Sequence, residues 1–116
     1  MKKYSWKLSL IALAGAVVAG PLGAADVAKG KEVYEKKCAM CHAKDLKGNP
    51  AMAKVYKLDP SALSLVSKQV LDQKDADLIA TTTKGKGKMP AQGGKISPDD
   101  IANSIAYIRS AAAPAK

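Results

Sequence analysis

The chain has 116 residues, of which 47% are hydrophobic, and it carries a formal net charge of +9 at pH 7. This length suits one small globular domain and excludes two. With one tryptophan, four tyrosines and no phenylalanine, any core is poor in aromatic side chains, and so small a domain often needs a disulfide, a metal or another cross-link for stability.

Residues 1–25 have the layout of a secretory signal peptide. Three lysines lie within the first seven residues, an uncharged run covers residues 8–20, and small residues follow at Gly23 and Ala25. This order predicts cleavage after Ala25. The alternative is an uncleaved membrane anchor, because residues 8–25 are uncharged over a length close to that of a bilayer span. Pro21 and the alanine and glycine content argue against that alternative.

The expected mature chain, residues 26–116, is still basic. Cleavage removes three lysines and no acidic residue, which lowers the formal charge from +9 to +6. We therefore expect a single exported, periplasmic domain with a basic surface.

The first predicted helix lies in "DVAKGKEVYEKKCAMCH", residues 26–42. Val27, Gly30, Val33 and Tyr34 recur at helical spacing, with charged residues elsewhere, so the helix is amphipathic and carries the cysteines at its end. Gly30 lowers helix stability relative to alanine, and a close helix crossing at this point would account for it.

Both cysteines and the single histidine lie within "CAMCH", residues 38–42. This is the C-x-x-C-H attachment pattern for c-type haem. Cys38 and Cys41 are three residues apart, so on a helical turn their sulfurs lie on one face and can form thioethers to two haem vinyl groups. His42 can then direct an imidazole nitrogen at the iron as an axial ligand. The pattern predicts one covalently attached haem c.

Two other kinds of site use a C-x-x-C pair. A thioredoxin-like dithiol lies at the start of a helix after a strand, and no βαβ pattern is present. A zinc site needs a fourth ligand and usually a second Cys or His pair, and the sequence has none left. Covalent haem therefore explains the motif better than either alternative.

Residues 43–59, "AKDLKGNPAMAKVYKLD", are predicted to form a long loop along one side of the haem. A helix is expected to begin at Asp59 and Pro60, and its apolar face would consist of Leu63, Val66 and Val70. A further helix is predicted from about Asp75 to Gly85, where glycine suits a left-handed C-cap. No β alternation is present.

The stretch "KGKGKMPAQGG", residues 84–94, follows that helix. It lacks the Gly-Lys-Ser/Thr end of a phosphate-binding loop, and its glycines come after a helix instead of a strand. With one histidine in the chain, the second iron ligand must be methionine, lysine, water or an exogenous molecule. Met89 is favoured over Met52 and Lys88, because it lies far from His42 in a flexible loop between two helices. A thioether ligand would raise the reduction potential and fill the last iron site.

The last predicted helix begins in "SPDDIANSIAYIRSAAA". Ser97 is the expected N-cap, Pro98 the first helical residue, and Asp100 completes a capping box. Its apolar stripe, at i, i+4 and i+7, consists of Ile101, Ile105 and Ile108. We expect this helix to cross the first one near Gly30.

Taken together, "GKEVYEKKCAMCH", "GKGKMP" and "ISPDDIANSIAYIRS" resemble the class I c-type cytochromes. The resemblance covers residues 26–116 and implies an all-α fold of about four helices around one covalent haem. In such proteins the terminal helices cross near a small residue and an aromatic, which here would be Gly30, Tyr34 and Tyr107. It also supports Met89, which is followed by a proline, as the distal ligand.

The resemblance implies two further contacts and shows two departures. The Pro50 carbonyl is the expected acceptor for the second N–H of His42, and Tyr56 is expected to pack on the haem or to bond a propionate. Relatives often have glycine after the proximal histidine and an aromatic after Met-Pro, whereas this chain has Ala43 and then "AQGG". What shields the distal side of the haem is therefore left open.

The function expected from this resemblance is a soluble periplasmic carrier of single electrons, not an enzyme. Lys84, Lys86 and Lys88 would dock redox partners with acidic patches. We expect a monomer without a nucleic-acid partner and without stable membrane insertion after cleavage. The rival functions are a haem sensor or peroxidase-like enzyme with a labile sixth site, and an electron-entry subunit of a larger redox complex.

Overall fold

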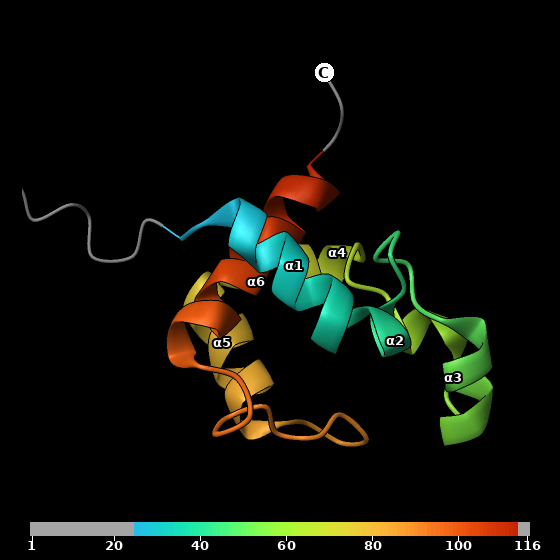
Figure 1. The fold of residues 1–116 in the computed structure, drawn as a ribbon. Helices are drawn as coiled ribbons and strands as arrows, with labels where there is room; N and C mark the ends of the chain where they lie inside the picture. Colours follow the sequence, from blue (N-terminus) through green and yellow to red (C-terminus); the bar gives the residue numbers. More distant parts are fainter. Residues whose placement is uncertain (1–24, 114–116) are drawn as a thin grey trace, which may run out of the picture.

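Short helices account for nearly all regular structure in the computed structural model, which describes residues 25–113 (Figure 1). In chain order they are α1 (Val27–Lys37), α2 (Ala39–His42), α3 (Pro50–Tyr56), the 3-10 helix η1 (Pro60–Leu63), α4 (Lys68–Leu71), α5 (Asp75–Lys84) and α6 (Pro98–Ala112). The expected all-α class is confirmed. The expected signal segment lies outside the described residues, except for Ala25. Within that described part, no helix combines the length and hydrophobicity that a membrane span needs.

Helices α1 and α6 cross at Gly30, as expected, and Figure 1 shows α1 lying across α6. A Cβ atom built on Gly30 would lie 1.9 Å from the main-chain oxygen of Asn103, so only glycine permits this approach. One turn later the fully buried Tyr34 ring packs against Tyr107, with ring centroids 5.4 Å apart. The pairing of a small residue with two aromatics is therefore present at the crossing.

The core lies on the inner side of this crossing. The predicted apolar stripe of α6 is buried, and it joins side chains from α1 and two loops in two clusters. Their buried members are Tyr34, Leu46, Ile105 and Ile108 in one, and Val33, Ile96 and Ile101 in the other. The start of α6 is also as predicted, because the Ser97 hydroxyl oxygen accepts from the Asp100 N–H at 3.1 Å.

The expectation of a loop over residues 43–59 was wrong in its second half. The Asn49 side chain accepts from the Ala51 N–H and Pro50 occupies the first turn, so these residues start α3. The single helix expected from Asp59 is also wrong, because it is divided into η1 and α4. Ser67 caps α4 with its side chain, which begins a separate helix there.

Arg109 of α6 holds the linker before α5 in place. Its Nε donates to Asp75 Oδ1 at 2.9 Å, Nη1 donates to the Leu71 carbonyl at 2.6 Å, and Nη2 donates to the Gln73 carbonyl. This planar donor fork ties α4, the following linker and α5 to α6. Helix α5 ends at Lys84, and Gly85 follows it as the expected C-cap residue. Its conformation, with φ 78° and ψ 165°, favours glycine but is not the left-handed helical one that was expected.

Candidate functional site

The C-x-x-C-H residues occupy a helical turn that is separate from α1. Cys38 lies between α1 and α2, and its carbonyl accepts from the N–H groups of Cys41 at 3.2 Å and His42 at 3.0 Å. Both cysteines are free and partly buried. Burial, helped by the nearby Cys41, raises the pKa of the Cys38 thiol to about 11. Both cysteines therefore lie on one short helical turn as free thiols.

The His42 ring is held in one tautomer. Its Nδ1 lies 2.8 Å from the Leu63 carbonyl, which can only accept, so Nδ1 carries the hydrogen. Burial lowers the pKa of His42, and the bond to Leu63 opposes this only in part. The ring is therefore neutral at pH 7, with the lone pair on Nε2, which is the form in which histidine binds a metal.

The predicted acceptor for this ring, Pro50, was wrong. Because Asn49 caps α3, Pro50 lies in the first turn of that helix, and the ring bonds Leu63 at the end of η1 instead. Gly48, at φ 95°, lets η1 approach, since a Cβ there would lie 3.0 Å from the Pro60 carbonyl oxygen. The Asn-Pro pair was the sequence signal for α3, but nothing local to the motif identifies Leu63.

The residues after His42 turn back and bond the carbonyls of α2. The Gly48 N–H donates to the His42 carbonyl, and the Asn49 N–H donates to the Cys41 carbonyl, both at 2.9 Å. The Asn49 side-chain amide donates to the Met40 carbonyl, also at 2.9 Å. The last three carbonyls of α2 are therefore all bonded by two adjacent residues.

Ala43 has a backbone conformation that favours glycine. Its φ is 64° and its ψ is 160°, directly after His42. Its carbonyl accepts from the Tyr34 hydroxyl at 2.6 Å. Burial raises the pKa of Tyr34, so the hydroxyl keeps its proton and acts as the donor. The absence of glycine at position 43, noted in the sequence, thus coincides with strain at this turn.

Met89 lies in the loop between α5 and α6, in a tight turn. Lys86 and Met89 exchange two main-chain hydrogen bonds of 3.1 and 2.9 Å, and Gly87 supplies φ 57° at the first central position. Gly85 lies so close to this segment that a Cβ on it would be 2.7 Å from the Met89 oxygen. The partly buried Met89 therefore lies in a well-defined, hydrogen-bonded turn and not in an irregular linker.

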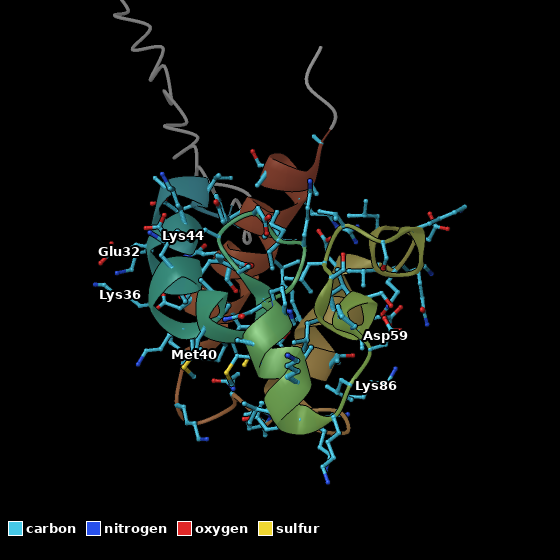
Figure 2. All side chains as sticks on the ribbon, turned by 90° about the vertical axis from the view of Figure 1, so that its right-hand side faces the viewer. Glu32, Lys36, Met40, Lys44, Asp59 and Lys86 are labelled. Atoms are coloured by element: carbon cyan, nitrogen blue, oxygen red, sulfur yellow. The ribbon has the colours of Figure 1, made fainter. Side chains whose placement is uncertain are left out.

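The base of the same loop is fixed to α5. The N–H groups of Gln92 and Gly93 donate to the carbonyls of Thr82 and Thr83, both at 3.0 Å. In Figures 1 and 2 the loop runs below α1 and α2. The structure thus brings Cys38, Cys41 and His42 into one turn and places Met89 on a separate, anchored loop below it.

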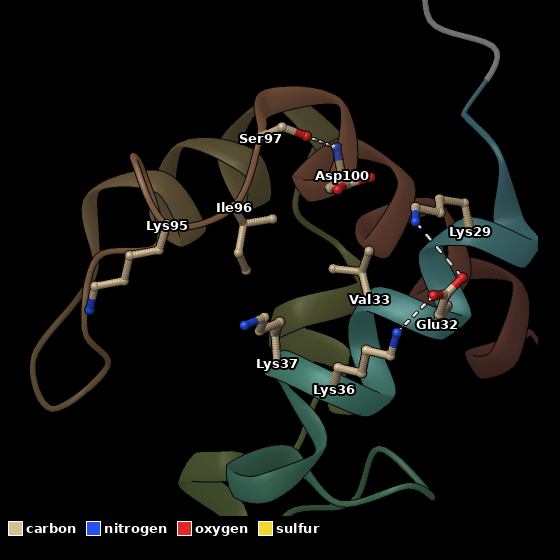
Figure 3. A pocket seen from close by; sticks show the side chains of 9 residues that line it. All are labelled: Lys29, Glu32, Val33, Lys36, Lys37, Lys95, Ile96, Ser97 and Asp100. Carbon is tan, nitrogen blue, oxygen red and sulfur yellow. Dashed lines mark hydrogen bonds and ion pairs between the residues drawn. The ribbon is translucent and has the colours of Figure 1, made fainter.

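A shallow groove beside α1 is a different feature (Figure 3). It is lined by charged side chains, with Glu32 paired to Lys29 and Lys36, and by Val33 and Ile96 at its base. Its volume of about 200 Å³ is below that of typical ligand pockets. It contains neither cysteine nor histidine, so it is not the site of the motif.

Comparison with known proteins identifies the family. A family model described as "Cytochrome C oxidase, cbb3-type, subunit III" matches residues 25–108. Cytochrome c6 of Picosynechococcus sp. is 40% identical over 91 residues, covering 76% of this chain and 75% of that protein. The chain belongs to the class I c-type cytochromes.

Further relatives agree with this family. Cytochrome c-555 of Chlorobaculum tepidum is 33% identical to this cytochrome over 105 residues, covering 84% of this chain and 89% of that protein. The solved structure of cytochrome c6 from the diatom Phaeodactylum tricornutum superposes with a TM-score of 0.56 at 28% identity, covering 75% of this chain and 94% of that one. The expected small cytochrome fold is confirmed.

The family membership also establishes the cofactor and the kind of activity. This cytochrome carries one covalently bound haem c, and it is an electron-transfer protein that acts with redox partner proteins, not an enzyme. The chain's own residues fit such a group, since two free thiols and a neutral imidazole with an open Nε2 share one turn. Tyr56, at the end of α3, remains 37% exposed.

Proposed function

We propose that this cytochrome is a soluble periplasmic electron carrier with His/Met axial ligation. In this proposal Cys38 and Cys41 form the two thioethers, and His42 Nε2 and Met89 Sδ bind the iron. The observation that carries it is the neutral His42 ring, whose Nδ1–H is given to Leu63 at 2.8 Å and whose Nε2 is left for a metal. Tyr56 is proposed to pack on the haem.

The choice of Met89 is supported by the positions of the other methionines. Met40 lies between the cysteines and is 69% exposed, and Met52 belongs to α3, which the loop after His42 fastens to the attachment turn. Met89 alone of these three is carried on a loop anchored to a different helix. Met52 and Lys88 are the alternative ligands.

The residues around the haem have clear roles in this proposal. Bound haem supplies a one-electron Fe(III)/Fe(II) couple. The Leu63 carbonyl fixes the His42 ring and raises its basicity, which favours Fe(III), while the Met89 thioether favours Fe(II). A filled sixth position excludes substrates, so the protein passes electrons without binding a reactant.

The axial ligand is tested by spectroscopy of the purified protein. The oxidised protein should show a methionine-to-iron charge-transfer band, and the ferrous protein should not bind carbon monoxide readily at neutral pH. Met89→Ala should abolish the band and open the iron to carbon monoxide, whereas the control Met52→Ala should leave both unchanged. A wild-type protein that lacks the band would instead support a sensor or peroxidase-like site.

The proposed docking surface is formed by Lys84, Lys86 and Lys88 beside the Met89 loop. Among the described residues these three are in no ion pair, whereas lysines along α1 are paired with Glu32 or Glu35. Lys86, labelled in Figure 2, points outward from the lower part of the molecule. Unpaired lysines around one loop favour partners with acidic patches, and we propose a monomeric carrier.

Charged small-molecule oxidants test this surface directly. A triple Lys→Gln variant at residues 84, 86 and 88 should be oxidised by ferricyanide several-fold more slowly, with a weaker salt dependence, and a cationic cobalt complex should not be slowed. The control replaces Lys29, Lys31 and Lys36 instead, which removes the same charge from α1. Equal slowing in both variants would mean that only net charge matters.

Export is tested by the mass of the protein recovered from the periplasm. We propose cleavage after Ala25, so the mature chain should begin at Asp26 and carry one haem.

The family description also motivates a second candidate, an electron-entry subunit of an oxidase complex. Stable co-purification with a membrane oxidase would favour that candidate over a free carrier.

A further inference from the structure

Asn49 bonds two helices at once, because its side chain has both a donor and an acceptor. The amide nitrogen Nδ2 donates to the Met40 carbonyl of α2 at 2.9 Å. The amide oxygen Oδ1 accepts from the Ala51 N–H at the start of α3 at 3.0 Å. The main-chain N–H of Asn49 also bonds the Cys41 carbonyl at 2.9 Å. One residue thus closes the end of α2 and begins α3.

Helix α2 depends on such outside partners. It has four residues, Ala39–His42, which is too short for a helix to be stable by itself. The last carbonyls of any helix lack partners within it. Here the Met40 and Cys41 carbonyls are both satisfied by Asn49, and the His42 carbonyl by the adjacent Gly48. The orientation of Cys41 and His42 therefore depends on residues 48 and 49.

The residue type at position 49 is informative. Asparagine, aspartate and serine cap a helix N-terminus about equally well, so capping α3 would not by itself require asparagine. Aspartate has no donor at pH 7, and a serine hydroxyl lies on a shorter side chain. Only the carboxamide combines the cap of α3 with the bond to Met40 that is seen here.

We propose that Asn49 is a positioning residue for the haem-attachment turn. Its side-chain amide holds α2 so that the His42 ring keeps its Nδ1 bond to Leu63. This inference rests on the proposed ligation of iron by His42. Loss of the amide donor loosens the turn and weakens the Nδ1 bond, so the imidazole becomes less basic and stabilises Fe(III) less. The reduction potential then rises.

Two substitutions in the haem-loaded, full-length protein separate the two roles of Asn49. Asn49→Ser and Asn49→Asp both keep a cap for α3 and both remove the amide donor to Met40. Asn49→Asp also lowers the net charge by one, and Lys47→Gln is its matched control. Lys47 lies two residues away in the same loop, and its exposed side chain makes none of these bonds.

Hydrogen exchange and potentiometry give the expected result. The amides of Gly48 and residue 49 should exchange about tenfold faster in both Asn49 variants. The Ala53 amide, which bonds the Asn49 carbonyl inside α3 at 3.0 Å, should not change. The ferric-to-ferrous ratio at a fixed electrode potential should fall about threefold in Asn49→Ser, and likewise in Asn49→Asp relative to Lys47→Gln.

The inference is overturned if the hydrogen exchange of the Gly48 amide and the reduction potential are unchanged in both variants. The comparison is with the wild-type protein for Asn49→Ser and with Lys47→Gln for Asn49→Asp. Asn49 would then be no more than the cap of α3. Faster exchange at Gly48 without any change of potential would also overturn it, because the turn would move without affecting the iron. The exchange result does not require that His42 binds iron, whereas a wild-type protein without histidine ligation would refute the proposed function itself.

Discussion

Two regions of this molecule, the crossing of α1 and α6 and the chain between them, are stabilised by different means. At the crossing of α1 and α6, side chains such as Tyr34, Ile101 and Ile105 are nearly or completely buried. In residues 38–92, by contrast, only Leu46 and Ala53 are buried hydrophobics. That second region is shaped instead by main-chain hydrogen bonds and by residues at positive φ.

This difference shows where the haem is needed for folding. Backbone hydrogen bonds contribute little net stability when their groups could bond water instead, whereas apolar burial is the main favourable term. The crossing supplies such burial from the chain itself. The region of the proposed site, which carries Cys38, His42 and Met89, lacks it, so we expect its core to come largely from the haem.

The largest effect is therefore expected from removing the haem. A Cys38→Ala/Cys41→Ala double variant made without haem should be largely unfolded. The lost group is several side chains in size, each worth about 1.5–3 kcal/mol on burial, and total stability is only about 5–15 kcal/mol. Far-ultraviolet circular dichroism measures this, and a native-like helical spectrum would contradict the contrast between the two regions.

The next largest effect is expected at the crossing itself. Gly30→Ala places a Cβ 1.9 Å from the Asn103 oxygen, so α1 and α6 must move apart. We expect a loss of about 3 kcal/mol or more in the free energy of unfolding, measured by denaturant titration of the haem-loaded protein. Lys31→Ala, on the exposed face of α1, is the control and should change stability by about 0.5 kcal/mol at most. Equal effects would mean that the contact is not tight.

A smaller effect, here a gain in stability, is expected in the region of the proposed haem site. Ala43→Gly relieves the positive φ after His42 and should add about 1 kcal/mol of stability. For a domain of this size the thermal midpoint should rise by about 4–8 °C. Ala106→Gly, inside α6, is the control and should lower the midpoint, because glycine is unfavourable within a helix. A lower midpoint for Ala43→Gly would show that position 43 is not strained.

The smallest effect is expected on the outer face of α1. Glu32 pairs with Lys36 at 2.8 Å and Lys29 at 3.8 Å, and its bond to Lys36, followed by the charge of Lys29, lowers its pKa. Any stability that the Glu32 carboxylate contributes is present above the pKa that Glu32 has in the unfolded chain. It is lost as the pH falls through the lower pKa of Glu32 in the folded protein. Because the pair is exposed, Glu32→Gln should leave the thermal midpoint at pH 7 unchanged. A clear drop in the thermal midpoint would mean that these exposed ion pairs contribute to the stability of the helix crossing.

The sequence predicted the crossing better than the region of the proposed haem site. Helix α6 could be located from Ser97 and its isoleucine spacing, and Gly30 signalled a close contact, because these are short-range patterns. The partner of His42 could not be found in this way, since Leu63 lies 21 residues away and is placed by the backbone of η1. Asn49 and Pro50 did signal a helix start, but seven residues give little periodicity to detect.

The site followed the same division between local and distant signals. Cys38, Cys41 and His42 stood out because the motif is contiguous and its spacing has a chemical reason. Nothing local to Ala43 indicates that its carbonyl is bonded by Tyr34, nine residues earlier. The residues of the motif could thus be predicted from the sequence, whereas the distant contacts that hold them in place were found only in the structure.

The hydrogen bond at the start of the described helices has a consequence for protein processing. The Asp26 main-chain nitrogen donates to Asn103 Oδ1 at 2.9 Å, and the Asp26 carboxylate caps α1 by accepting from the Lys29 N–H at 3.0 Å. A chain cut after Ala25 would keep both contacts, with an ammonium group as the donor to Asn103. A cut one residue later would lose both. The accuracy of the export peptidase would then decide whether the first turn of the protein is anchored or frayed.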